Sequence, residues 1–141
     1  MQGDVTPIQT LVPQTITSTT NLTHADGGEA HGVLHTINIG NSGDTLSGSV
    51  YWTVSMQHSD ATGSGWSTVT DADHIVDELN SSNASGILAT IDAPAEDQIV
   101  VAAHYVGPKR YSRLAITATG THTNGTPCSG VSVYSHQRKA P

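Results

Sequence analysis

The chain has 141 residues, enough for one domain with a real core but too few for two comfortable ones. Only 12% of the residues are charged, and 19 Thr and 15 Ser supply much of the polarity beside 14 Gly. The formal net charge of −7 argues against nucleic acid as a partner, because phosphate binding needs a net basic surface. Because β-branched residues such as Thr favour strands, this composition predicts an all-β domain with many turns.

The first residues contain neither a basic start nor an apolar run, so we expect no signal peptide. No stretch approaches the ~20 apolar residues of a membrane span, and no membrane partner is expected. A single cysteine, Cys128, excludes an internal disulfide and indicates assembly in a reducing cytoplasm.

Residues 1–30 hold two prolines and many threonines, and we predict an extended N-terminal arm with one edge strand over 14–20. Alternating apolar residues predict the first strands of a domain over 31–141. They lie at 31–40 and 49–59, the latter returning through a turn to 65–70. The acidic segment 71–82 is the one candidate helix.

Further strands are predicted at 86–92, 98–106, 113–123 and 129–136, separated by polar turns. The run 98–106 is almost continuously apolar, which indicates burial on both faces. Strands at this spacing predict a single antiparallel β-sandwich of jelly-roll type. The predicted core comprises Val33, Ile37, Ile39, Val50, Trp52, Val54, Leu88, Ile99, Val101, Leu114, Ile116, Val131 and Val133.

The residue types needed for catalysis or for metal binding do not form a recognisable site in the sequence. His31 and His35 are four apart, which on a strand is ~13 Å and too far for one ion. The cluster of Asp71, Asp73 and His74 lacks the glycine and distal glutamate of a calcium loop. Neither a nucleophile elbow nor a glycine-rich phosphate loop is present. We therefore expect a protein that is not an enzyme and that binds no metal and no cofactor.

Both tryptophans flank one predicted turn, where His58 and Asp60 also stand. Trp52 shares a strand face with Val54 and Met56, which predicts a core position. Trp66 is open to either interpretation: packed in the core, or exposed as a platform on which a sugar ring stacks. The local polar residues at the turn favour an architectural role.

Two segments carry a resemblance to a known family. The stretch MQHSDATGSGWSTVTDAD resembles the His-Ser-Asp, glycine turn, Trp, Val-Thr pattern of small proteins encoded in the structural gene clusters of tailed phages. The segment 104–141, with GPKRYSR and GTHTNGTP, is similar to their C-terminal half. The resemblance covers about residues 50–141. It implies a small β-rich virion protein of the capsid surface, a decoration (cement) protein of HK97-like heads that is usually a homotrimer and binds the major capsid protein.

The basic residues supply the candidate interface. All 12 acidic residues lie between Asp4 and Asp97, and all five basic ones between Lys109 and Lys139, which favours docking of the basic segment on an acidic surface. Arginine and tyrosine contribute much of the binding energy of interfaces. The predicted contacts are Lys109, Arg110, Tyr111, Arg113, Arg138 and Lys139. Two alternatives stay open: a tail tube or terminator component, and a carbohydrate-binding module of a fibre or adhesin.

Overall fold

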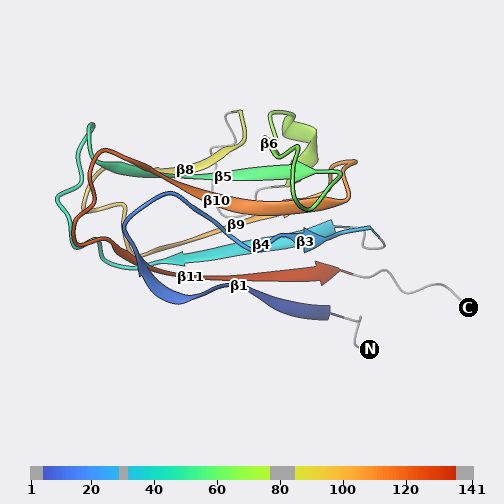
Figure 1. Ribbon diagram of the computed structural model, residues 1–141, viewed down its shortest axis with the longest axis horizontal. Coiled ribbons are helices and arrows are strands. Elements are labelled where there is room, and N and C mark those ends of the chain that lie inside the picture. Colours follow the sequence, from blue (N-terminus) through green and yellow to red (C-terminus); the bar gives the residue numbers. More distant parts are fainter. Residues whose placement is uncertain (1–4, 29–31, 77–84, 136–141) are drawn as a thin grey trace, which may run out of the picture.

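Two antiparallel sheets face each other in the computed structural model, which describes residues 5–28, 32–76 and 85–135 (Figure 1). The five-stranded sheet has the order β1 (Val5–Ile16), β11 (Thr126–Ser135), β4 (Gly32–Ile39), β9 (Ile99–Tyr105), β7 (Ile75–Val76). The six-stranded sheet has the path β2 (Thr20–Asn21), β10 (Tyr111–Thr119), β5 (Tyr51–Ser59), β6 (Ser67–Thr68), with β3 (Ala25–Asp26) on β10 and β8 (Ile87–Ile91) on β5. The predicted all-β antiparallel sandwich is confirmed.

The N-terminal segment is part of the sandwich, in place of the predicted arm. β1 pairs with β11 from Val5 to Ile16, and β2 and β3 pair with β10, so the first described residues contribute to both sheets. Pro7 and Pro13 lie on an edge strand, where a missing N–H is tolerated. The register shifts between Leu11 and Gln14, around Pro13. The strand therefore occupies 5–16 and not 14–20.

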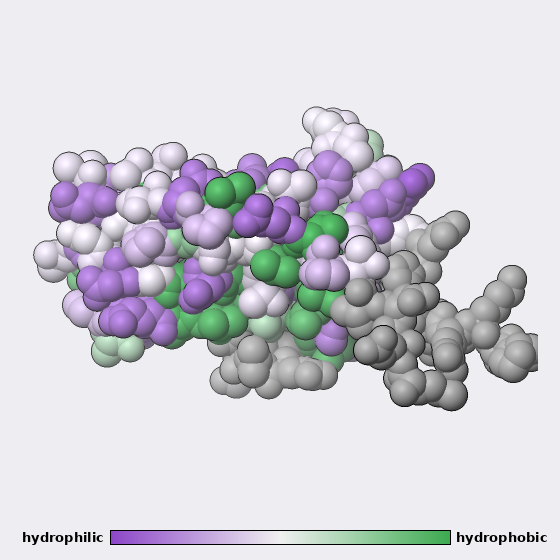
Figure 2. Space-filling view, turned by 90° about the horizontal axis from the view of Figure 1, so that it is seen from below, coloured by the Kyte–Doolittle hydropathy of each residue, from purple (hydrophilic) through white to green (hydrophobic). Residues whose placement is uncertain are grey.

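The core lies between the sheets and contains nine of the thirteen predicted residues. These are buried: Val33, Ile37, Ile39, Trp52, Val54, Leu88, Val101, Leu114 and Ile116. The prediction was wrong for Val131, which is 42% exposed. Val50 and Val133 are only partly buried, and Ile99 is partly buried but packs against the core. Apolar side chains come to the surface on the side formed by β1 and β11 (Figure 2), where Val12 is also exposed.

Strand β11 explains part of this error. Its inward positions are Thr126, Cys128, Gly130 and Ser132, all small, and its valines point outward. A Cβ on Gly130 would lie 2.6 Å from Leu22 and 3.2 Å from Leu11, so side chains from the N-terminal segment fill the space that β11 leaves open. Since alternate residues face opposite sides of a strand, this choice places Val131 and Val133 outside.

Two further predictions are corrected. Strand β9 is buried on both faces only in part: Val101, Ala103 and Tyr105 point inward and Ala102 is buried on the outer face, whereas Val100 is 47% exposed, because no third layer of described residues covers this sheet. The candidate helix is a single 3-10 turn, η1 (Ala72–His74), followed by β7, which pairs with β9. Residues 77–82 of that prediction lie outside the described residues. Among the described residues, no helix has the length and apolar character needed to span a membrane.

A histidine ties the two sheets together inside the core. The ring of His35 on β4 lies 2.6 Å from Ser132 Oγ on β11 and, across the sandwich, 2.7 Å from Ser112 Oγ on β10. Burial lowers the pKa of His35 to about 3, and His104 acts in the same direction. The ring is therefore neutral at ordinary pH, with a serine hydroxyl at each nitrogen.

Candidate interaction surface

Four of the six predicted interface residues gather at one end of the six-stranded sheet. The turn 107–110 leads into β10, so Lys109 and Arg110 lie at its start and Tyr111 and Arg113 on it. Ser112 and Leu114 point into the sandwich, which places Arg113 on the outer face. Arg138 and Lys139 lie outside the described residues.

These residues join others to form a continuous stack of rings and guanidinium groups, which we call the aromatic ladder. It runs Arg110, Tyr111, His24, Trp66, Arg113. The Arg110 guanidinium lies 5.1 Å from the Tyr111 centroid, and Tyr111 meets His24 edge-on at 5.4 Å. His24 lies 5.8 Å from Trp66, whose ring carries the Arg113 guanidinium at 4.1 Å. Trp, Tyr and Arg are the residue types that dominate protein interfaces.

Arg110, at one end of the aromatic ladder, has its own carboxylate. Its Nε donates to Asp26 Oδ1 at 2.9 Å and its Nη2 to Asp26 Oδ2 at 2.8 Å, a bidentate pair on exposed side chains. The hydrogen bond from Arg110 is the main reason that the pKa of Asp26 lies below its ordinary value. This pair joins β3 to the start of β10.

Arg113, at the other end, has no carboxylate among the described residues. Its Nε donates to Gln57 Oε1 on β5 at 2.9 Å, and its guanidinium lies over Trp66. Burial lowers the pKa of this half-buried arginine from its ordinary value, with no charged group acting to offset it. The guanidinium stays protonated all the same, because its ordinary pKa is above 12.

A hollow of about 480 Å³ opens beside Arg110. Its lining combines two cations with one carboxylate and small backbone segments: Gly27, Gly28, Asp60, Gly107, Pro108, Lys109 and Arg110. Gly107 is required here because a Cβ would lie 2.6 Å from the Tyr105 hydroxyl. That hydroxyl in turn accepts from the Lys109 backbone N–H and lies 2.8 Å from His58 Nδ1, so the turn is held from inside.

The two tryptophans have different roles. Trp52 is fully buried and stacks on His122 at 4.0 Å, whereas Trp66 is half-buried in the aromatic ladder. His58 points toward Tyr105 of the opposite sheet, and burial is the main cause that lowers its pKa. Asp60 lies on the hollow. The turn between the tryptophans thus supports the aromatic ladder and does not pair the two rings.

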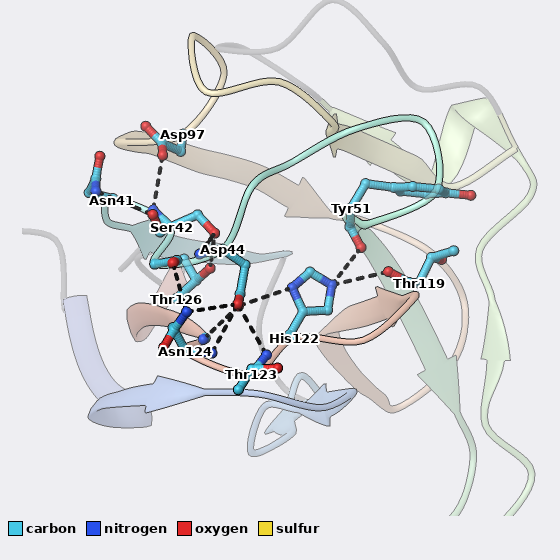
Figure 3. A network of polar contacts seen from close by, with 12 residues as sticks. Asn41, Ser42, Asp44, Tyr51, Asp97, Thr119, His122, Thr123, Asn124 and Thr126 are labelled. Carbon is cyan, nitrogen blue, oxygen red and sulfur yellow. Dashed lines mark hydrogen bonds and ion pairs between the residues drawn. The ribbon is translucent and has the colours of Figure 1, made fainter.

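A second cluster of polar residues lies at the opposite end of the sandwich (Figure 3), and we call it the Asp44 clasp. The Asp44 carboxylate accepts backbone N–H groups of Thr123, Asn124 and Gly125 at 2.7–3.1 Å. These hydrogen bonds lower the pKa of Asp44, and the one from the Asn124 backbone contributes most. Asp97 accepts the backbone N–H of Ser42 in the same way. The clasp therefore joins the loop after β4 to the turn between β10 and β11.

The contacts of His122 in the Asp44 clasp are those of a structural residue and not of a catalytic base. Its Nε2 lies 3.3 Å from the Tyr51 carbonyl and 3.1 Å from that of Thr119, so this nitrogen is a donor to two backbone oxygens. Its Nδ1 lies 3.8 Å from Asp44 Oδ2 (Figure 3). A nitrogen that donates to fixed carbonyls is not available to accept a proton from a nucleophile.

The remaining candidate for a catalytic residue is Cys128, as a nucleophile. It is buried, its Sγ lies 3.6 Å from the Thr126 carbonyl, and burial raises its pKa to about 11. The reactive form of a cysteine is the thiolate, which this environment disfavours. Within the described ranges, His, Cys, Asp and Glu side chains form no group of three or more that could hold a metal ion.

His24, Asp26 and Gln57 complete the aromatic ladder and its neighbourhood, yet they were not predicted. Asp26 lies on β3 and His24 directly before it, and only the pairing of β3 with β10 brings both to Tyr111. Gln57 had a local signal, since it lies on the strand face opposite Trp52, but its partner Arg113 is 56 residues away.

Comparison with known proteins adds little. No protein-family model and no curated protein matches the chain. Among solved structures, the chain resembles the crystal structure of the SPBc2 prophage-derived protein YomS, with 9% identity over 94% of this chain and 96% of that chain. The TM-score is 0.36. A likeness at this level supports no conclusion about function.

Proposed function

We propose that this protein is a non-enzymatic virion structural protein, a decoration (cement) protein that binds the major capsid protein on the outside of an HK97-like phage head. The observation that carries the proposal is the aromatic ladder on the outer face of the six-stranded sheet. It contains the residue types that anchor protein interfaces, and two of them, Tyr111 and Arg113, lie on strand β10. The phage resemblance of the segments around Trp66 and Arg113 points to the same role.

The polar clusters support a non-enzymatic role. The ring nitrogens of His35 and Nε2 of His122 are engaged with serine hydroxyls and backbone carbonyls, and burial keeps the Cys128 thiol protonated. A cement protein must resist unfolding, and these contacts join the sheets and loops of the sandwich. Repeated over a closed lattice, modest contacts at each copy accumulate by avidity.

A carbohydrate-binding role fits the aromatic ladder less well. A sugar stacks on an open aromatic face, and the Trp66 ring is already covered by the Arg113 guanidinium at 4.1 Å and flanked by His24. Titration of the protein with a broad glycan panel, followed by tryptophan fluorescence, should leave the spectrum unchanged. A saturable change with one glycan class would favour the adhesin alternative.

The deciding experiment is binding to capsids. Heads assembled from the major capsid protein of the same phage, but lacking this protein, are mixed with the purified chain and sedimented. We expect saturable co-sedimentation at a fixed ratio to the capsid protein, with the free chain remaining a small oligomer. Assembly of the free chain into rings or tubes, without head binding, would instead indicate a tail component.

A further inference from the structure

The two arginines of the aromatic ladder differ in one respect that bears on the partner. Asp26 occupies the fork of Arg110 with two hydrogen bonds. Arg113 has the same side chain and a similar aromatic contact, but within residues 5–28, 32–76 and 85–135 it makes no ion pair. Its contacts there are one hydrogen bond from Nε to Gln57 and the ring of Trp66.

This arrangement leaves strong donors without an acceptor. An arginine has five N–H donors in a planar fork, and Arg113 uses only Nε–H, so the four Nη–H groups have no acceptor among the described residues. The side chain is half-buried, and a partly desolvated cation without a counter-charge is unfavourable. The burial-driven fall of its pKa expresses the same imbalance.

The Arg113 fork is also held in place before any partner arrives. The guanidinium carbon lies over the Trp66 ring, 4.1 Å from its centroid, and Gln57 restrains rotation of the side chain by accepting from Nε. Trp66 is itself fastened, since its Nε1 donates to the Thr62 carbonyl at 3.2 Å. A fixed planar fork loses little entropy on pairing, and its Nη edge matches the two oxygens of a carboxylate.

We propose that Arg113 is the receptor for one carboxylate side chain, an aspartate or glutamate, of the protein on which this chain docks. Trp66, His24 and Tyr111 then pack against the apolar part of the same segment. Identifying that protein as the capsid protein rests on the proposed function, whereas the carboxylate site itself does not. A polyanion is a poor alternative, because the chain carries a net charge of −7 and would repel it.

The first test needs no capsid. ¹⁵N-labelled protein is titrated with the α-amide of N-acetylglutamate, which carries a single side-chain carboxylate, and the Nε–H signals of both arginines are followed by NMR. We expect the signals of Arg113 and of the Trp66 indole to shift saturably in the millimolar range. The Arg110 signal should stay nearly fixed, because Asp26 already occupies its fork. The matching glutamine amide is the control and should shift neither.

Two results of that titration would overturn the site. Equal shifts of Arg110 and Arg113, or no shift of Arg113, would show that Arg113 is not a selective receptor. Inorganic phosphate acting as strongly as the carboxylate would show a general anion site instead. Because the test uses the unaltered chain, it does not depend on any variant folding correctly.

The second test uses heads and a matched pair of variants. Arg113→Lys keeps the charge but loses the planar fork, and Arg110→Lys makes the same change where the fork is engaged internally. We expect Arg113→Lys to raise the Kd for heads at least about tenfold, and Arg110→Lys, in the same ladder, to raise it by a clearly smaller factor. Equal effects of the two variants would refute the assignment on the capsid. If the unaltered chain binds no heads, the proposed function fails while the NMR result still decides the carboxylate site.

Discussion

The two ends of the sandwich contain similar residue types, which are buried at one end and partly exposed at the other. Around the Asp44 clasp, a tryptophan, a histidine and an aspartate turn inward: Trp52 is fully buried against His122, and Asp44 binds three backbone N–H groups. The other end of the sandwich is the one where β5 ends and β10 begins (Figure 1). There, Trp66 and His24 stay half-exposed in the aromatic ladder.

The difference between the ends shows what separates a structural cluster from an interaction surface. At the clasp, the Asp44 charge is met by N–H groups of the chain itself. On the aromatic ladder, Arg113 is oriented by Gln57 and Trp66 yet lacks a counter-charge among the described residues. Residue type alone therefore does not distinguish the two ends, whereas the pairing of their charged groups does.

The largest expected effect contrasts the two tryptophans. Trp52→Ala should lower the free energy of unfolding by ~3–5 kcal/mol, because it empties a fully buried site and removes the stack on His122. Trp66→Ala should lower it by about 1 kcal/mol or less, as expected for a surface side chain, while weakening head binding. Urea unfolding of both variants measures the difference. Similar losses of unfolding free energy would show that both tryptophans are core residues and would contradict this contrast between the ends.

Acid should act through the buried histidine that lies between the two ends. The folded pKa of His35 is about 3 against 6.5 when unfolded, so the unfolded chain binds the extra proton between these values. This contribution to stability is complete above about pH 6.5 and is lost as the pH falls toward 3. Between pH 7 and 5 the loss should be roughly 2 kcal/mol by urea unfolding.

The control for the acid effect is His35→Gln, whose side chain does not titrate. It should be less stable at pH 7 but should lose most of the pH dependence between 7 and 5. A residual slope of the same sign is expected, because burial also lowers the pKa of His58. An unchanged slope in His35→Gln would show that other groups cause the acid sensitivity.

The Asp44 clasp should respond to loss of its charge with a smaller effect. Asp44→Asn removes the carboxylate that accepts from Thr123, Asn124 and Gly125, so the melting temperature should fall while head binding stays unchanged. Asp60→Asn is the matched control: Asp60 is exposed on the hollow, and its loss should leave the melting temperature unchanged. Loss of head binding in Asp44→Asn, with its fold intact, would mean that this end also contacts the capsid.

The smallest effect on stability is expected for Arg110→Gln. Its pair with Asp26 lies on side chains that are 58% and 44% exposed, and exposed pairs contribute about 0–1 kcal/mol. Stability should fall by less than about 1 kcal/mol and should depend weakly on salt, as measured by urea unfolding at two ionic strengths. A larger loss would make this pair a structural contact comparable to the clasp.

Period-two patterns located most strands, but not which side of each strand is buried. Trp52, Val54 and the inward residues of β4 were predicted correctly because their apolar positions alternate with polar ones. The pattern failed on β11, where Val131 and Val133 alternate just as well but lie on the outer face. It failed again at 71–82, where β-branched Ile75 and Val76 complete a sheet edge that local propensity does not show.

Only the part of the candidate site that is contiguous in the sequence could be predicted. The cations and Tyr111 of the turn before β10 stand together in the sequence, so their clustering could be predicted. His24, Asp26, Gln57 and Trp66 reach them only through pairing of β3 and β5 with β10 and of β6 with β5. The pairings with β10 join residues dozens of positions apart, whereas β6 pairs with β5 across a short turn.

The sequence by itself determined the class of fold, because β-branched residues, glycines and alternation are local properties of each strand. It also determined where charge is concentrated along the chain. Only the tertiary structure decided that the N-terminal segment belongs to both sheets, that Arg110 is paired, and that Arg113 is left with free donors among the described residues. The physical reason is that a strand's exposed face and an ion's partner depend on which distant strand lies beside it, and hydrogen bonding between sheet neighbours sets this.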